Sequence, residues 1–292
     1  MTAVALEGAG ASARPRAGLR RWARNPSTVV GGTLVGLVVL TALVSLVWTP
    51  YPPLAVDPSH TLARPSWAHL FGTDEYGRDV LSRVMAGSRI SLYAGVVSVL
   101  VATAVGVPAG LLAAERGGAP AQLVLRLSDI LYAFPALLAA ITLSAALGAS
   151  TTTAMLAIGI AFIPVFVRVT RSNALVVLGS DFVLAARAYG RRPLAILRRH
   201  VLPNIATTLI AQMSLLFSLA ILAEAGLDYL GLGTTPPTAS WGNMIETGQT
   251  YLSQDPLLSV WPGIAIFVAV LGFTLLGEGI AELRNARLGR ST

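Results

Sequence analysis

Long uncharged apolar runs alternate with shorter polar segments along this chain of 292 residues. Each run has about 20 residues, which at 1.5 Å per helical residue is enough to cross roughly 30 Å of hydrocarbon. We therefore expect an all-α, polytopic membrane protein with six membrane-spanning helices. The predicted spans cover residues 28–48, 90–113, 128–148, 151–167, 205–227 and 259–280.

The polar segments divide the chain around these spans. We predict an N-terminal segment (residues 1–27), a first span (28–48), a polar segment (49–89), a core of five spans (90–282) and a short tail (283–292). None of the polar segments is long enough to form a domain with its own core. The first span follows several arginines, as in a signal peptide, but no small-residue cleavage site comes after it, so we interpret it as an uncleaved helix.

The arginines indicate how the spans are oriented. Seventeen of the 21 lie before the first span, after the second, after the fourth or after the last. Cytoplasmic segments of membrane proteins carry the excess of Arg and Lys, so this pattern predicts that both termini are cytoplasmic. The remaining four lie in the segment then expected outside the cell: Arg64, Arg78, Arg83 and Arg89.

Composition agrees with a membrane protein. Hydrophobic residues make up 54% of the chain and charged residues only 12%, about half the usual share in soluble domains. The net charge of +7 could indicate nucleic-acid binding in a soluble protein. Here the basic residues flank the apolar spans and form no patch with interleaved aromatic residues, so we expect contact with membrane lipid and none with nucleic acid.

The residue types that are missing exclude several chemistries. Cysteine is absent, which excludes disulfides and thiolate metal sites. Lysine is absent too, so the chain has no standard phosphate-binding P-loop. The three histidines, His60, His69 and His200, are widely spaced in a pattern that does not suit a metal. We predict no catalytic residue, no metal site and no cofactor bound by this chain.

Two groups of acidic residues could carry a function. Asp74, Glu75 and Asp79 alternate with glycines and Arg78, which favours local helix capping and ion pairing over catalysis. The second group lies near the ends of apolar spans and comprises Asp129, Glu224 and Glu278. Ionisable residues at membrane depth can form a proton relay in a stand-alone secondary transporter or channel. We favour a structural role, because side chains near the interface can reach water.

Residues 180–204 predict two short helices with a break between them. Ser180 can cap the first helix, and Gly190 and Pro193 are suited to end it and to start the next. In the second helix Leu194, Leu197 and Val201 recur at helical spacing with arginines around them. Such an amphipathic, basic helix can lie on anionic lipid or dock on a protein partner.

The same segment carries a recognisable motif. Ala185, Ala186, Gly190, Leu202 and Pro203 stand at the spacing of the EAA loop of bacterial ABC importer permeases, which this segment resembles. In that family the loop is cytoplasmic and its short helix docks in a groove on the ATPase subunit. The resemblance implies a role in ATPase coupling for Ala185, Ala186, Gly190, Arg191, Pro193, Leu194, Leu197, Leu202 and Pro203.

The resemblance extends beyond this loop. The stretch FGTDEYGRDVLSRVMAGSRISL (residues 71–92, the outer motif) is similar to one in the peptide and nickel importer permeases. LAEAGLDYLGLG (222–233) and PPTASWGNMI (236–245) match the same family, and its C-type members have a first span like residues 28–48. The extracytoplasmic motif positions are Gly72, Thr73, Asp74, Gly77, Arg78 and Asp79.

Two positions depart from the family pattern. Leu184 stands where the EAA motif has Glu, which removes any polar contact that the Glu would make to the ATPase. The tail after Gly277 reads EGIAELRNAR, where the family tends towards Asp-Gly-Leu-Arg-Asp, so we assign the tail no role.

The resemblance implies a type I ABC importer permease in a bacterial plasma membrane. Its expected partners are a homologous permease that completes a heterodimer, two ATPase subunits or one fused pair, and an extracytoplasmic solute-binding protein. ATP and Mg²⁺ would bind the ATPase subunits. Peptides, nickel chelates and haem are the candidate cargoes, because importers of all three share these motifs.

Overall fold

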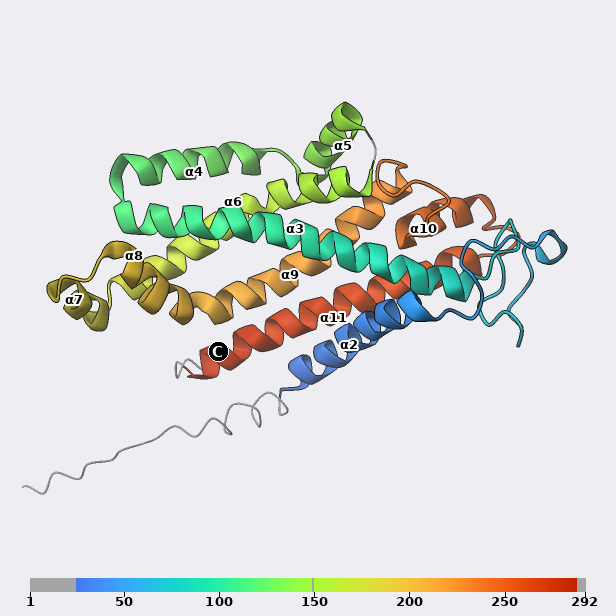
Figure 1. Ribbon diagram of the computed structural model, residues 1–292, viewed down its shortest axis with the longest axis horizontal. Coiled ribbons are helices and arrows are strands. Elements are labelled where there is room, and N and C mark those ends of the chain that lie inside the picture. Colours follow the sequence, from blue (N-terminus) through green and yellow to red (C-terminus); the bar gives the residue numbers. More distant parts are fainter. Residues whose placement is uncertain (1–24, 149, 288–292) are drawn as a thin grey trace, which may run out of the picture.

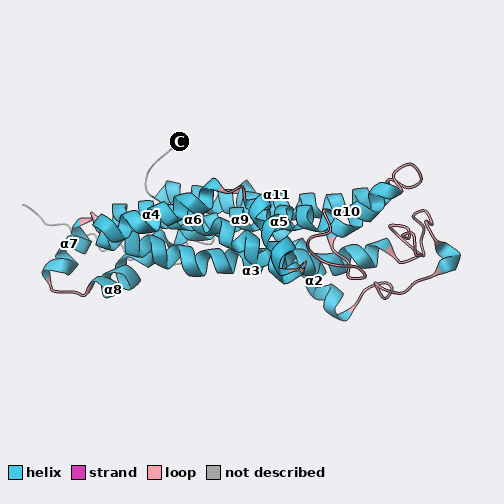
Figure 2. Ribbon diagram, turned by 90° about the horizontal axis from the view of Figure 1, so that it is seen from above, coloured by secondary structure: helices cyan, strands magenta, loops and turns pink. Residues whose placement is uncertain are grey.

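The computed structural model describes residues 25–148 and 150–287, and its regular elements there are helices. Figure 1 shows long helices lying side by side, with α7 and α8 at one end and α10 at the other, beside the loop that follows α2. The same division into two ends is visible from above in Figure 2. This arrangement confirms the all-α prediction.

Five helices in the described residues are long and apolar enough to cross a membrane, and a bent pair is a sixth candidate. The five are α2 (Pro26–Val47), α3 (Val80–Arg116), α6 (Thr151–Leu178), the continuous stretch Pro193–Tyr229 and α11 (Leu257–Arg287). The bent pair is α4 (Gly118–Ala133) with α5 (Ala136–Leu147). Short elements are η1 (Pro58–His60), α7 (Asp181–Ala188) and α10 (Trp241–Thr250).

The third predicted span is broken. A continuous helix over residues 128–148 was expected, but α4 and α5 meet at an angle of 82°. Phe134 at the break has an extended conformation, with φ −83° and ψ 125°. Pro135 follows it, and a proline both lacks an N–H donor and disfavours helical geometry in the preceding residue. The bend therefore has a local cause, even though the run is apolar throughout.

Helix α3 is longer than the hydropathy pattern predicts. It begins at Val80, ten residues before the expected span, and ends at Arg116. Asp79 caps its first turn by accepting a hydrogen bond from the Ser82 backbone N–H. Hydropathy detects only the part of a helix that lies in hydrocarbon, so the capped polar turns were assigned to the segment outside. Arg83 and Arg89 accordingly lie on the helix itself.

Small residues allow the helices to approach closely. At Gly159 on α6, an added Cβ would lie 2.8 Å from the Val101 Cβ and 2.9 Å from the Ser98 carbonyl oxygen on α3. The Ser98 hydroxyl also donates to the Met155 carbonyl across the same contact, at 2.9 Å. Glycine and serine at helix interfaces are typical of bilayer proteins, in which close packing and interhelical hydrogen bonds replace the hydrophobic effect.

Candidate functional site: the EAA loop and the outer face

The segment 180–204 contains the two short helices expected from its sequence. α7 ends at Ala188, Gly190 adopts a left-handed φ of 72°, and Pro193 starts α8 (Pro193–Ile196). Ser180 occupies the N-cap position of α7, but its hydroxyl donates to the Val177 carbonyl at 2.5 Å and accepts no helix N–H. The predicted position of the cap is confirmed, whereas its predicted side-chain bond is wrong.

The second short helix continues directly into a membrane span. α8 leads through a π-turn, η2 (Leu197–Val201), into α9 (Leu202–Tyr229). The motif residues Leu202 and Pro203 lie at the junction of η2 and α9. Because Pro203 has no N–H to donate to the preceding turn, the hydrogen-bond ladder widens there. One helix therefore connects the loop to the opposite end of the molecule.

The apolar stripe of this segment does not form one exposed face. Leu194 is 65% exposed, but Leu197 is only 8% exposed and Val201 is fully buried. Both buried residues pack with Val183 and Ile205 in the chain's own core. The prediction that Leu197 is a surface anchor for a partner is therefore wrong, because Leu197 packs in the chain's own core.

A different apolar surface faces outward at the loop. Phe182 and Leu184 on α7 are about half exposed, and Tyr189 in the turn is 88% exposed. Leu184 therefore presents an apolar side chain where the family motif has Glu. Arg187 of α7 donates to Glu115 Oε2 at 2.9 Å and ties the loop to the end of α3, a link that the sequence did not indicate.

Arginines line a hollow beside Leu194 at the start of α8. Leu194 and Ala195 lie with three arginines around a surface hollow of about 580 Å³. The arginines that line it are Arg192, Arg198 and Arg199, and Arg191 beside them is exposed. Ala185 is exposed and Ala186 half buried on α7. The loop thus offers apolar side chains beside a cluster of positive charge.

At the other end of the molecule, the outer motif folds into a tight turn built on Asp74. Asp74 Oδ1 accepts hydrogen bonds from the Tyr76 and Arg78 backbone N–H groups, both at 2.9 Å. Gly72 and Gly77 have left-handed φ values of 78° and 72°. At Gly77 the Asp57 carbonyl lies where a Cβ would be, so only glycine fits.

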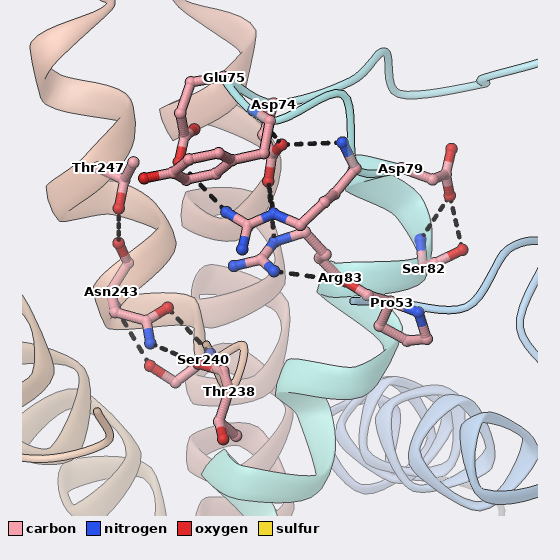
Figure 3. A network of polar contacts seen from close by, with 12 residues as sticks. Pro53, Asp74, Glu75, Asp79, Ser82, Arg83, Thr238, Ser240, Asn243 and Thr247 are labelled. Atoms are coloured by element: carbon pink, nitrogen blue, oxygen red, sulfur yellow. Dashed lines mark hydrogen bonds and ion pairs between the residues drawn. The ribbon is translucent and has the colours of Figure 1, made fainter. Parts of the chain in front are cut away.

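Buried charges hold this turn to α3 (Figure 3). Asp74 Oδ2 pairs with Arg78 Nε at 2.6 Å and with Arg83 Nε at 3.3 Å, and all three side chains are at most 10% exposed. Arg78 also donates to Glu75 Oε1 at 3.2 Å, and burial raises the pKa of the Glu75 carboxyl. These contacts confirm the local capping and pairing expected for the acidic residues of the outer motif.

Asp79 and Thr73 complete the turn. Asp79 Oδ2 accepts from the Ser82 hydroxyl at 2.7 Å, and Asp79 Oδ1 lies 3.0 Å from His69 Nδ1. The Thr73 hydroxyl accepts from the Ala63 N–H and donates to the His60 carbonyl. The motif residues are therefore chiefly structural, since they fix the loop to the first turns of α3.

The motif PPTASWGNMI packs against the outer motif, although more than 150 residues separate the two contacting residues, Val84 and Trp241, in the sequence. Ser240 and Asn243 form a reciprocal capping box at the start of α10. Trp241 Nε1 then donates to the Val84 carbonyl of α3 at 2.9 Å. An added Cβ at Gly87 would lie 2.9 Å from the Trp241 ring. Both motifs are recognisable in the sequence, but no local pattern in it indicates that they touch.

Residues 106–290 match the family described as binding-protein-dependent transport system inner membrane component. This match covers more than half of the chain. The chain belongs to this family of importer permeases.

Curated relatives match this permease over almost its whole length. A probable D,D-dipeptide transport system permease protein of Escherichia coli K12 is 39% identical over 91% of this chain and 89% of its own. A di/tripeptide transport system permease protein of Pseudomonas aeruginosa is 37% identical over 91% and 90% of the two chains. A glutathione transport system permease protein of Pectobacterium atrosepticum is 35% identical over 92% and 90%.

A solved structure supports the fold. The permease matches a chain of an inward-facing methionine ABC transporter with a TM-score of 0.58 at 16% identity, covering 68% of this chain and 95% of that one. At this identity the likeness concerns the fold alone. It agrees with the expected type I importer architecture.

The acidic residues near the span ends of this permease differ in their surroundings. Asp129 pairs with Arg168 at 2.7 Å, and Glu278 is exposed. Glu224 is 1% exposed and accepts from the Ser91 hydroxyl of α3 at 3.1 Å, while Asp228 Oδ1 accepts from the Thr234 N–H at 2.6 Å. These contacts tie helices and loops together, in line with the structural role we favoured. The expectation that these side chains reach water is wrong for Glu224, which is fully buried. Within the described residues, no three His, Asp or Glu side chains gather as metal ligands would.

Proposed function

We propose that this permease is the translocation subunit of an ATP-driven importer for dipeptides or oligopeptides delivered by an extracytoplasmic binding protein. The names of the relatives support peptides as the cargo class. The observation that carries the mechanism is the unbroken helix from Pro193 to Tyr229. This helix starts in the EAA loop and ends beside the outer motifs. A displacement of the loop by the ATPase would therefore move the whole of α9.

In this proposal ATP and Mg²⁺ bind partner ATPase subunits and this chain holds neither. ATP binding closes the ATPases, the EAA loop follows them, and the attached span tilts so that the pathway opens alternately to either side. The equilibrium between the two states shifts only as far as the ATPases bind one of them better. We expect the chain alone to hydrolyse no ATP, because it lacks a P-loop lysine.

The remaining partners follow from the proposed role. A homologous permease would complete a heterodimeric pathway, and the binding protein would dock at the end formed by α10 and the outer motif. We place the complex in a bacterial plasma membrane with the EAA loop and both termini in the cytoplasm, as the arginine distribution predicts.

The docking surface on this chain is the exposed part of the EAA loop. Leu194 is its central apolar residue, with Leu184 and Phe182 across the turn and the arginines around it. An apolar centre with a charged rim is the usual anatomy of a protein interface. A groove with an acidic rim on the ATPase would complement it.

Two leucines three residues apart, Leu194 and Leu197, provide a matched test of docking. Leu194→Asp places a charge on the exposed surface, so the permease should fold and insert but lose ATPase subunits on co-purification. A lost interface anchor costs about 2 kcal/mol or more, roughly a 30-fold weaker association. Leu197→Asp buries a charge in the chain's own core, so it should lower the amount of folded permease instead.

Uptake into proteoliposomes completes the experiment. The whole complex with its binding protein should accumulate peptide only with ATP, and Leu194→Asp should abolish this accumulation. Full ATPase binding and coupled uptake in Leu194→Asp would refute the docking role. Uptake by this chain without ATPase subunits would favour the stand-alone transporter instead.

A further inference from the structure

A second hollow, of about 340 Å³, opens at the outer end of the molecule. Its walls come from three segments: Pro53 and Leu54 after α2, Ala86 and Ile90 on α3, and Thr238 before α10. Ligand pockets for small solutes begin at about this volume. The lining is mostly apolar; Thr238 is its one neutral polar residue and Arg89 of α3 its one charged residue.

The wall of this hollow is held in place by the contacts between the two outer motifs. Asn243 Nδ2 donates to the Thr238 carbonyl at 2.8 Å, as Figure 3 shows. Trp241 is bonded to Val84, one turn before Arg89 along α3. On the other side, Arg83 Nη1 donates to the Pro53 carbonyl at 3.4 Å. These contacts hold the backbone of the walls in place around the hollow.

Arg89 differs from the other arginines of this end. Arg78 and Arg83 are paired with Asp74, and Arg64 is exposed to water. Arg89 is half buried, and within the part of the chain that the structure describes it has neither an ion pair nor a hydrogen bond. A half-buried guanidinium that has no counter-charge within the described residues favours an anion that can reach it.

The position of Arg89 suits a solute arriving from outside. It lies nine residues after Val80, the first residue of α3, which is roughly 13 Å along the helix, and immediately before the apolar run that begins at Ile90. An anion can reach this depth from water but not much deeper. Apolar walls with a single cation match a small solute that carries one carboxylate, which a guanidinium binds with two parallel hydrogen bonds.

We propose that Arg89 and the hollow around it form an outer subsite that binds the terminal carboxylate of the incoming peptide. The proposal rests on the proposed peptide-import function and names the part of the solute that is recognised. Peptides with a blocked C-terminus should therefore enter the pathway poorly.

The absence of cysteine allows a direct binding test. In membranes containing the whole complex, Leu54→Cys places a thiol in the wall of the hollow, and its labelling by an impermeant maleimide can be followed on this chain. A defined mixture of di- and tripeptides with free carboxylates should slow labelling, whereas the same peptides as C-terminal amides should not. Ala68→Cys, exposed in the same outer segment, should be labelled at one rate throughout.

Substitution of Arg89 then tests whether the protection depends on its guanidinium group. With Arg89→Gln, the peptide concentration that half-protects Leu54→Cys should rise about ten-fold or more, because a charge-assisted hydrogen bond is lost. Arg89→Lys should recover part of the protection, and Arg64→Gln should change nothing. Equal protection by acids and amides, or protection unaffected by Arg89→Gln, would overturn the proposal.

Two other partners of Arg89, a lipid phosphate and the homologous permease, would give different results in these experiments. If Arg89 binds lipid phosphate, labelling of Leu54→Cys will follow the anionic lipid content of the vesicles and ignore peptide. If Arg89 pairs with the homologous permease, Arg89→Gln will lose that subunit on purification. Either result contradicts the subsite. A wild-type complex that takes up no peptide with ATP refutes the proposed function, whereas normal uptake without carboxylate protection refutes only the subsite.

Discussion

At the scale of single residues, the outer motif shows how charge can hold a loop together at a membrane surface. Asp74 faces two guanidinium groups, those of Arg78 and Arg83, and caps two backbone N–H groups as well. Each charged group is buried, so each needs the others. The outer motif thereby determines where α3 begins and what it presents to the outer hollow.

Asp74→Asn should be strongly destabilising. It keeps the size of the side chain but leaves Arg78 and Arg83 without their shared carboxylate, and breaking a buried pair typically costs about 3–5 kcal/mol. Thermal unfolding of the purified complex should show a clearly lower midpoint. Glu246→Gln on the exposed side of α10 is the matched control and should have little effect. Equal midpoints for the two variants would contradict this role of Asp74.

At the scale of elements, close helix contacts and helix breaks determine the architecture. α3 and α6 approach through Gly159 and Gly106, where added Cβ atoms would meet the opposite helix. α4 and α5 depart from a straight span at Phe134 and Pro135. The second half of the EAA loop, in contrast, continues from Pro193 through η2 into α9 without a break. Close contacts keep the spans packed together, and the continuous helix joins the loop to α9. A movement of the loop is therefore transmitted to that span.

Gly159→Leu should prevent α3 and α6 from packing. The side chain would overlap the Val101 side chain and the Ser98 backbone, and overpacking of this kind costs about 1–3 kcal/mol or more. We expect less folded permease on size-exclusion chromatography and faster proteolysis. Gly36→Leu on α2 meets nothing within 4 Å and should be tolerated. As much folded permease with Gly159→Leu as with Gly36→Leu would contradict this packing role of Gly159.

At the scale of the whole molecule, the two ends have different chemistry. The end with α7 and α8 carries an apolar surface with arginines beside it. The other end carries paired charges and a hollow. A permease that alternates between two sides needs one end for the ATPases and one for the binding protein, and the long helices between them connect the two.

Orientation can be tested with two equivalent probes. Ala68→Cys lies in the exposed loop before α3, and Ala119→Cys lies exposed at the start of α4. In intact cells an impermeant maleimide should label Ala68→Cys and should reach Ala119→Cys only after permeabilisation. The reverse pattern would invert the topology derived from the arginines.

The sequence by itself determined the features that depend on local composition. Five of the predicted spans correspond to helices, because a run of about 20 apolar residues can be accommodated only in a bilayer or a large core. Gly190 and Pro193 indicated the break and the restart in the EAA loop, because backbone geometry is a local property. The acidic residues of the outer motif suggested caps for the same reason.

The tertiary structure alone decided which side chains are free to act. The spacing of Leu194, Leu197 and Val201 is identical whether the stripe faces a partner or the chain's own core, and only the packing of the chain's other helices around η2 buries the last two. Arg83 and Arg89 look equivalent along the sequence, yet one meets Asp74 and the other faces a hollow. Burial and pairing depend on segments far apart in the chain, which no local pattern records.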